Sequence, residues 1–183
     1  FTQIILNMLG GIAFLAGLMY LHLNELPMTI TGMVDLAGAG TAQSALLVMP
    51  VLLLSLAALT KAAQMPFHTW LLGAMVAPTP TSALLHSSTM VKAGVFLMVK
   101  LSPLYATYPV AGFMVTSVGA ITFLLAALMA ISQSNAKRVL AYSTISNLGL
   151  ISACLGVGAP EAIWAAIFLI LFHTVAKSLL FLC

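Results

Sequence analysis

Charged residues are scarce in this sequence: only 5% of its 183 residues are Asp, Glu, Lys or Arg, and three are acids. A soluble domain carries roughly 25% charged residues. With 62% hydrophobic residues and a mean hydropathy of +1.17, the composition excludes a soluble domain and predicts an integral membrane protein. The net charge of +3 is small and scattered along the chain, which argues against a nucleic-acid partner.

Short alternating apolar segments, which are typical of a membrane β-barrel, are also absent from the sequence. The apolar runs have helical length, so the predicted fold class is an all-α membrane protein with a single transmembrane domain. The chain starts and stops inside apolar runs, which predicts a piece of a longer polypeptide. We expect about six transmembrane helices, at roughly 2–22, 45–72, 80–100, 109–132, 138–157 and 161–183.

Ligands for redox groups are missing as well. The two cysteines, Cys154 and Cys183, lie in apolar runs without ligand spacing, so we expect packing residues rather than a metal site or a disulfide. No quinone, flavin, haem or cluster ligands are visible. We therefore expect no cofactor, and no redox catalysis by this chain itself.

The few charges outside the predicted spans differ between the two sides of the bundle. The positive-inside rule places the 133–138 loop in the cytoplasm, in a multi-pass protein of the cell inner (plasma) membrane. That loop carries Lys137 and Arg138, whereas the other side carries Glu25, Asp35, Glu161 and Lys100. Lys100 itself is expected to lie at a helix end as an interfacial anchor. The only long connection, 23–43, holds two of the three acids.

The second predicted span is too long for one straight crossing, and "TKAAQMPFHTW" supplies a break. Pro66 has no N–H for the preceding turn, so the helix should kink or unwind around residues 62–66. Lys61 lies just before this break, where Gln64, His68 and free carbonyls could hold water. The alternative is a tilted helix in which Lys61 reaches the membrane surface.

Two further lysines lie within predicted spans. Lys92 is about 18 Å from the start of its span and about 12 Å from its end, with His86 less than two turns earlier. Lys177 follows His173 by four residues, so both project from one helix face. The histidines alone would more often be packing residues, and Lys177 alone could reach the surface, but together they form a line of buried nitrogen bases.

Acidic partners for these lysines are absent from the predicted spans. Three unpaired ammonium groups would cost roughly 8–10 kcal/mol in a bilayer. They must therefore share water, lose their protons or meet carboxylates from outside this chain. A row of Lys and His across a bundle indicates a proton relay. Ser143 and Asn147 could carry connecting water, or could equally make interhelical hydrogen bonds.

Three stretches resemble the antiporter-like membrane subunits shared by respiratory complex I, Mrp cation/proton antiporters and energy-converting hydrogenases. They are "KAAQMPFHTWLLGAMVAPTPTSALLHSSTMVKAG", "KRVLAYSTISNLG" and "FHTVAKSLLFL". The resemblance implies two inverted repeats, with 1–100 ending the first and 109–183 starting the second. It also implies that a proton-translocation path runs through Lys61, His86, Lys92, His173 and Lys177.

The resemblance further implies partners: other membrane subunits of a multisubunit complex, the lipid bilayer, and protons with or without Na⁺. Many relatives carry an acid two residues before Lys137, where this chain has Asn135. Lys92 and the wording "AISQSNAKRVLAYSTISNLGL" favour the hydrogenase and Mrp branches, and we expect a hydrogenase membrane arm. The competing functions are a small-solute transporter with its substrate near Pro66 and a non-transporting scaffold subunit.

Overall fold

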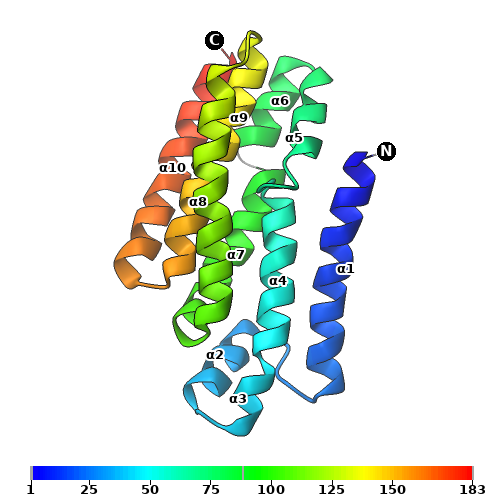
Figure 1. Cartoon of the computed structure of the whole chain (residues 1–183), viewed down its shortest axis with the longest axis vertical. Coiled ribbons are helices and arrows are strands. Elements are labelled where there is room, and N and C mark those ends of the chain that lie inside the picture. Colours follow the sequence, from blue (N-terminus) through cyan, green and yellow to red (C-terminus); the bar gives the residue numbers. More distant parts are fainter. Residues whose placement is uncertain (1, 88, 183) are drawn as a thin grey trace.

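The computed structural model describes residues 2–87 and 89–182, and every regular element in these residues is a helix (Figure 1). The long helices are α1 (Thr2–Leu23), α4 (Val48–Lys61), α7 (Met90–Thr107), α8 (Pro109–Ile131), α9 (Ala136–Val157) and α10 (Pro160–Leu182). The shorter ones are α2 (Ile30–Gly38), α3 (Ala42–Leu46), α5 (Thr69–Gly73), the 3-10 helix η1 (Ala74–Val76) and α6 (Thr79–Ser87).

Six segments of the described chain are long and apolar enough to cross a bilayer. This confirms the predicted all-α membrane bundle of about six transmembrane helices. Large apolar side chains such as Phe113 on α8 and Phe172 on α10 are exposed, as expected for surfaces in contact with lipid. The packing role expected for Cys183 concerns a residue outside the described ranges.

Helix α9 is the central element of the bundle. It packs against α8 and α10, which lie beside it in Figure 1, and also against α7. Its side chains Ile145, Leu148 and Ile151 are fully buried. The Asn135 side chain caps its start by accepting the Lys137 N–H at 3.0 Å, and Gly158 ends it with a left-handed φ of 72°.

Close contact between α8 and α9 depends on glycines on both helices. A Cβ atom on Gly119 would lie 2.6 Å from the Ala153 nitrogen of α9. A Cβ atom on Gly149 would lie 2.6 Å from the Phe123 nitrogen of α8. Because real Cβ atoms do not approach backbone so closely, the two helices touch main chain to main chain along this line.

Helix α4 lies between α1 and α7, and it approaches α7 equally closely. A Cβ atom on Gly94 of α7 would lie 2.5 Å from the Ala58 carbonyl oxygen. Because α7 packs against the α4 main chain at Gly94, the C-terminal turn of α4 is held in place.

The third span differs from its expected form of one helix over 80–100. It consists of α6 and α7, and Thr89 between them has the non-helical dihedrals φ −104° and ψ −94°. The Thr89 hydroxyl donates to the Leu84 carbonyl of α6 at 3.1 Å. A side-chain hydroxyl that donates to a helix carbonyl competes with the backbone N–H that would otherwise continue the helix.

The predicted end of that span at Lys100 is also wrong. Helix α7 continues through Pro103 to Thr107, so Lys100 lies inside the helix with an exposed side chain. Pro103 cannot donate to the Val99 carbonyl, but the Ser102 hydroxyl donates to it at 2.7 Å. This substitute hydrogen bond explains why the helix passes the proline.

Two connections are more regular than the sequence suggested. The long connection at 23–43 contains α2, whose Met33 and Ala37 side chains are buried and whose helix packs on α7. The expected loop at 133–138 is shorter, because Asn135 starts α9 at Ala136. Lys137 and Arg138 therefore belong to the first turn of α9.

We predict that Gly119→Ala destabilises the protein by about 1–3 kcal/mol, because the new methyl group must push α8 away from the α9 backbone. Thermal unfolding of the purified protein in detergent measures this change. The matched control is Gly11→Ala on α1, where a Cβ atom meets nothing within 4 Å. Equal midpoints for the two variants would contradict the main-chain contact.

Candidate functional site

The break predicted near Pro66 is present, and it covers residues 62–68 between α4 and α5. Ala63 has a left-handed φ of 53°, and the Met65–Pro66 peptide is cis. The backbone of the break still has a hydrogen-bond partner within the protein, because the Gln64 N–H donates to the Leu59 carbonyl at 3.0 Å. Irregular backbone at membrane depth requires such internal partners.

Helix α8 supports the break with one buried hydroxyl. The Met65 N–H donates to the Thr122 hydroxyl oxygen at 3.0 Å, and that hydroxyl donates to the Val118 carbonyl at 2.7 Å. Thr122 is fully buried. Sequence reasoning missed this residue, although a lone hydroxyl in the apolar run "AITFLLAALMAI" was a visible signal.

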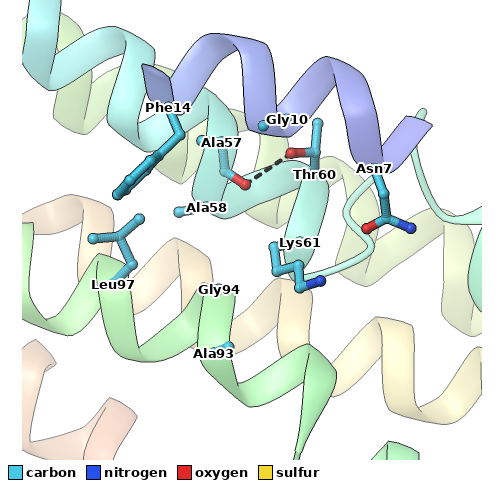
Figure 2. A pocket seen from close by; sticks show the side chains of 11 residues that line it. Asn7, Gly10, Phe14, Ala57, Ala58, Thr60, Lys61, Ala93, Gly94 and Leu97 are labelled. Carbon is cyan, nitrogen blue, oxygen red and sulfur yellow. Dashed lines mark hydrogen bonds between the residues drawn. The ribbon is translucent and has the colours of Figure 1, made fainter. Parts of the chain in front are cut away.

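Lys61 is the last residue of α4, is half-buried, and lines two cavities, the first of which is drawn in Figure 2. The first has a volume of about 240 Å³ and is lined by α1, α4 and α7. The second, of about 510 Å³, is lined by Lys61, Trp70 and residues of α1, η1, α6 and α7. Asn7 of α1 lines both cavities, and neither lining includes an acid.

The other two lysines donate to main-chain carbonyls of neighbouring helices. The Lys92 ammonium donates to the Ile170 carbonyl of α10 at 3.1 Å. The Lys177 ammonium, on a side chain that is only 3% exposed, donates to the Leu140 carbonyl of α9 at 3.1 Å. No acid of the described chain pairs with either ammonium: Glu25 follows α1, Asp35 lies on α2 and Glu161 begins α10, and all three are exposed.

Each of these carbonyls has a second side-chain donor. The Ile170 carbonyl also accepts the Thr174 hydroxyl at 2.7 Å, and the Leu140 carbonyl accepts the Thr144 hydroxyl at 2.9 Å. In both cases the threonine is four residues further along the acceptor's own helix. The two lysine contacts therefore have the same construction on different helices: one carbonyl, one threonine and one ammonium.

The two histidines are buried and lack hydrogen-bond partners within the described residues. His86 is 0% and His173 5% exposed, and none of their four ring nitrogens has a partner. The His86 ring stacks on Phe181 of α10 with 5.1 Å between centroids. Buried polar nitrogens of this kind ordinarily bind water.

Four of the five predicted relay residues form one cluster around α10. His173 and Lys177 belong to this helix, Lys92 donates to its Ile170 carbonyl, and the His86 ring stacks on its Phe181. These residues come from α6, α7 and α10, and α6 packs against α10. Lys61 makes no hydrogen bond with Lys92, and Lys92 does not line either cavity beside Lys61.

The polar residues of α9 are used mainly within the protein. The Asn147 amide donates to the Ser143 carbonyl of its own helix at 2.7 Å. Ser146 makes an interhelical bond, because its hydroxyl donates to the Phe123 carbonyl of α8 at 3.0 Å. Ser143 is half-buried, and a water-chain role for Ser143 and Asn147 stays a prediction.

A bundle of apolar helices with ionisable residues in its interior is the usual construction of ion-pathway membrane proteins. The family model described as NADH:quinone oxidoreductase/Mrp antiporter, TM, matches residues 1–183. The chain belongs to this family.

Relatives from two kinds of complex resemble the chain. One subunit of the Na(+)/H(+) antiporter of Alkalihalophilus pseudofirmus is 38% identical over 194 residues, which are 98% of this chain and 24% of that protein. NADH-ubiquinone oxidoreductase chain 5 of Paracentrotus lividus is 52% identical over 130 residues, which are 71% of this chain and 20% of that protein. The chain therefore spans a quarter or less of the length of these relatives.

A solved structure has the same fold. A chain of the Mrp complex from Dietzia sp. DQ12-45-1b superposes on 98% of this chain with a TM-score of 0.90 and 36% sequence identity. The superposed part is 20% of that chain.

We predict that Thr122→Val destabilises the protein by about 1–3 kcal/mol, because the buried Met65 N–H loses its acceptor. Hydrogen exchange at the Met65 amide should also accelerate. The matched control is Ser152→Ala, whose buried hydroxyl donates only to the Leu148 carbonyl of its own helix at 2.8 Å. Unchanged Met65 exchange in Thr122→Val would show that α8 does not hold the break.

Proposed function

We propose that this chain is part of an ion-translocating membrane subunit, in which Lys61, His86, Lys92, His173 and Lys177 carry protons. The observation that carries the proposal is the cluster of nitrogen bases in the bundle interior. Their ammonium groups contact carbonyls rather than carboxylates, and their imidazole nitrogens have no partner among the described residues. A purely structural role would leave the four imidazole nitrogens of His86 and His173 buried without partners among the described residues, which costs free energy.

The Lys177 face of α10 connects two parts of this cluster. His173 precedes Lys177 by one turn, and both are buried on the same face. Two positive charges at this spacing repel each other, so a protonated lysine favours a neutral histidine. A proton that arrives at one group therefore favours release from the other, which is the property required of a relay step.

An Mrp-type cation/proton antiporter is the complex that the comparisons support best for this chain. One subunit of a Na(+)/H(+) antiporter and a chain of an Mrp complex both match nearly all of it. Assignment to a hydrogenase membrane arm stays a prediction. In either complex the partners would be other membrane subunits and the bilayer, and the ion would be H⁺, with or without Na⁺.

We also propose a topology and a repeat arrangement for the chain. The turn before Lys137 and Arg138 is assigned to the cytoplasm of a cell with an inner (plasma) membrane, because the positive-inside rule favours that orientation. Residues 1–100 and 109–183 are assigned to the end of one repeat and the start of the next. The turn at Tyr108, between α7 and α8, would then be the boundary between them.

Two other functions have support from particular features. A scaffold subunit would use its lysines to bind carboxylates of partner subunits. A small-solute transporter would place its substrate in the cavities of about 240 and 510 Å³ beside Lys61. Thermal stabilisation of the complex by a small solute would favour the transporter over the relay.

We predict that Lys177→Met leaves the complex assembled and lowers ion translocation by about tenfold or more, because the substituted side chain cannot bind a proton. The measurement is proton or sodium uptake into vesicles that contain matched amounts of the complex. A methionine has a similar length, so the packing between α10 and α9 is largely kept.

The matched control is Lys100→Met, which removes an exposed lysine of the bundle surface and should leave uptake unchanged. Wild-type uptake in Lys177→Met would show that Lys177 is only a packing residue. Loss of assembly in Lys177→Met, with wild-type uptake in the fraction that does assemble, would support the scaffold function instead.

A further inference from the structure

The two ends of the bundle carry opposite charge. The end at which α9 begins carries Lys137 and Arg138 in the first turn of that helix, and we call it the basic end. The acids Glu25, Asp35 and Glu161 lie at the other end, where α1 and α9 finish and α10 starts (Figure 1). Helix α9 has 22 residues, so about 33 Å separates the two ends.

A cavity of about 340 Å³ opens at the basic end. One wall comes from α5 and η1 and is apolar, with Leu72 and Val76. The other wall comes from α9 and the turn before it, with Arg138, Tyr142 and Gln133. Its lining shares no residue with either cavity beside Lys61.

Two hydrogen-bond donors of the α9 wall are available within this cavity. The Arg138 guanidinium is exposed and makes no hydrogen bond or ion pair with a described residue. Tyr142 is only 6% exposed, yet its hydroxyl has no hydrogen bond with any residue in the described ranges. A guanidinium and a phenol that line one cavity suit a phosphate oxygen, since Arg binds phosphate with paired N–H groups.

The other polar groups around the cavity are already bonded and hold its shape. The Gln133 amide donates to the Met129 carbonyl at 3.3 Å. The Lys137 ammonium donates to the Ala77 carbonyl at 3.4 Å, which ties the start of α9 to the segment after η1. Asn135 caps α9 without adding negative charge to this end of the bundle.

The apolar wall indicates which kind of group is attached to the phosphate. Val76 is 94% exposed and continues the wall from Leu72 toward the outside of the bundle. A soluble anion would gain nothing from this surface, whereas an acyl chain would cover it. The cavity lies at the end of membrane-spanning helices, the level at which lipid headgroups and their chains meet.

We propose that this cavity binds the headgroup of an anionic phospholipid, with its phosphate on Arg138 and Tyr142 and an acyl chain along Leu72 and Val76. The bound lipid joins α9 to the α5–η1 segment, which directly follows the break at residues 62–68. Lipid occupancy at this cavity therefore stabilises the position of α5 beside α9.

Native mass spectrometry of the whole complex, titrated with phosphatidylglycerol or phosphatidylcholine in detergent, tests this proposal. We predict that Arg138→Gln weakens phosphatidylglycerol binding about fivefold, because the loss of one basic charge near an anionic headgroup lowers affinity by about that factor. Arg138→Lys should weaken binding less, because the charge is kept. Val76→Ser should also weaken binding by removing apolar contact. Lys100→Gln, which removes an exposed lysine outside this cavity, is the matched control and should bind as the wild type does.

Three results would overturn the proposal. They are equal affinity for the two lipids, unchanged phosphatidylglycerol binding in Arg138→Gln, and displacement of the lipid by inorganic phosphate, which would identify a soluble-anion site. If Arg138→Gln fails to fold, Val76→Ser gives the decision alone: wild-type affinity in that variant excludes an acyl chain on this wall.

Discussion

Ammonium groups that meet no carboxylate among the described residues set the main constraint on this bundle. A charged lysine inside a bilayer costs about 2.5–3.5 kcal/mol, even when measured during insertion. Lys92 and Lys177 each reduce that cost by donating to a main-chain carbonyl of another helix. Each such bond requires the neighbouring helix to lie within reach of one side chain, so the lysines and the helix packing depend on each other.

Small residues make that packing possible at the level of the backbone. Gly119 and Gly149 bring α8 and α9 into main-chain contact, and Gly94 does the same for α7 and α4. Van der Waals contact between helices is the main attraction available in lipid, because the hydrophobic effect there is weak. The central helix α9 is thus held by its neighbours along its length, and it can present a fixed carbonyl to Lys177.

Sequence reasoning located the features that depend on one residue type. Pro66 predicted the break because a proline lacks the N–H that a helix needs, and the buried lysines stood out against an apolar background. It did not locate Thr122 or the carbonyls of Ile170 and Leu140. These are long-range partners, and which backbone atom a lysine meets depends on how two helices pack rather than on either sequence alone.

Errors in the predicted helix ends have a common cause. The end expected at Lys100 ignored a Ser102 hydroxyl that replaces the missing donor of Pro103. The single helix expected over 80–100 ignored a Thr89 hydroxyl that occupies a carbonyl of α6. One hydroxyl extends a helix and the other accompanies its interruption, so the residue type alone could not have separated the two cases. Which carbonyl the hydroxyl meets decides whether the helix continues or ends.

The paired donors on the Ile170 and Leu140 carbonyls affect the helices when a lysine moves. Thr174 and Thr144 donate to these oxygens independently of Lys92 and Lys177. When an ammonium swings away, its carbonyl keeps the threonine bond and is never left bare in a dry interior. The helices can therefore stay still while the side chains rearrange, so the scaffold contributes little resistance to each departure or return of a lysine.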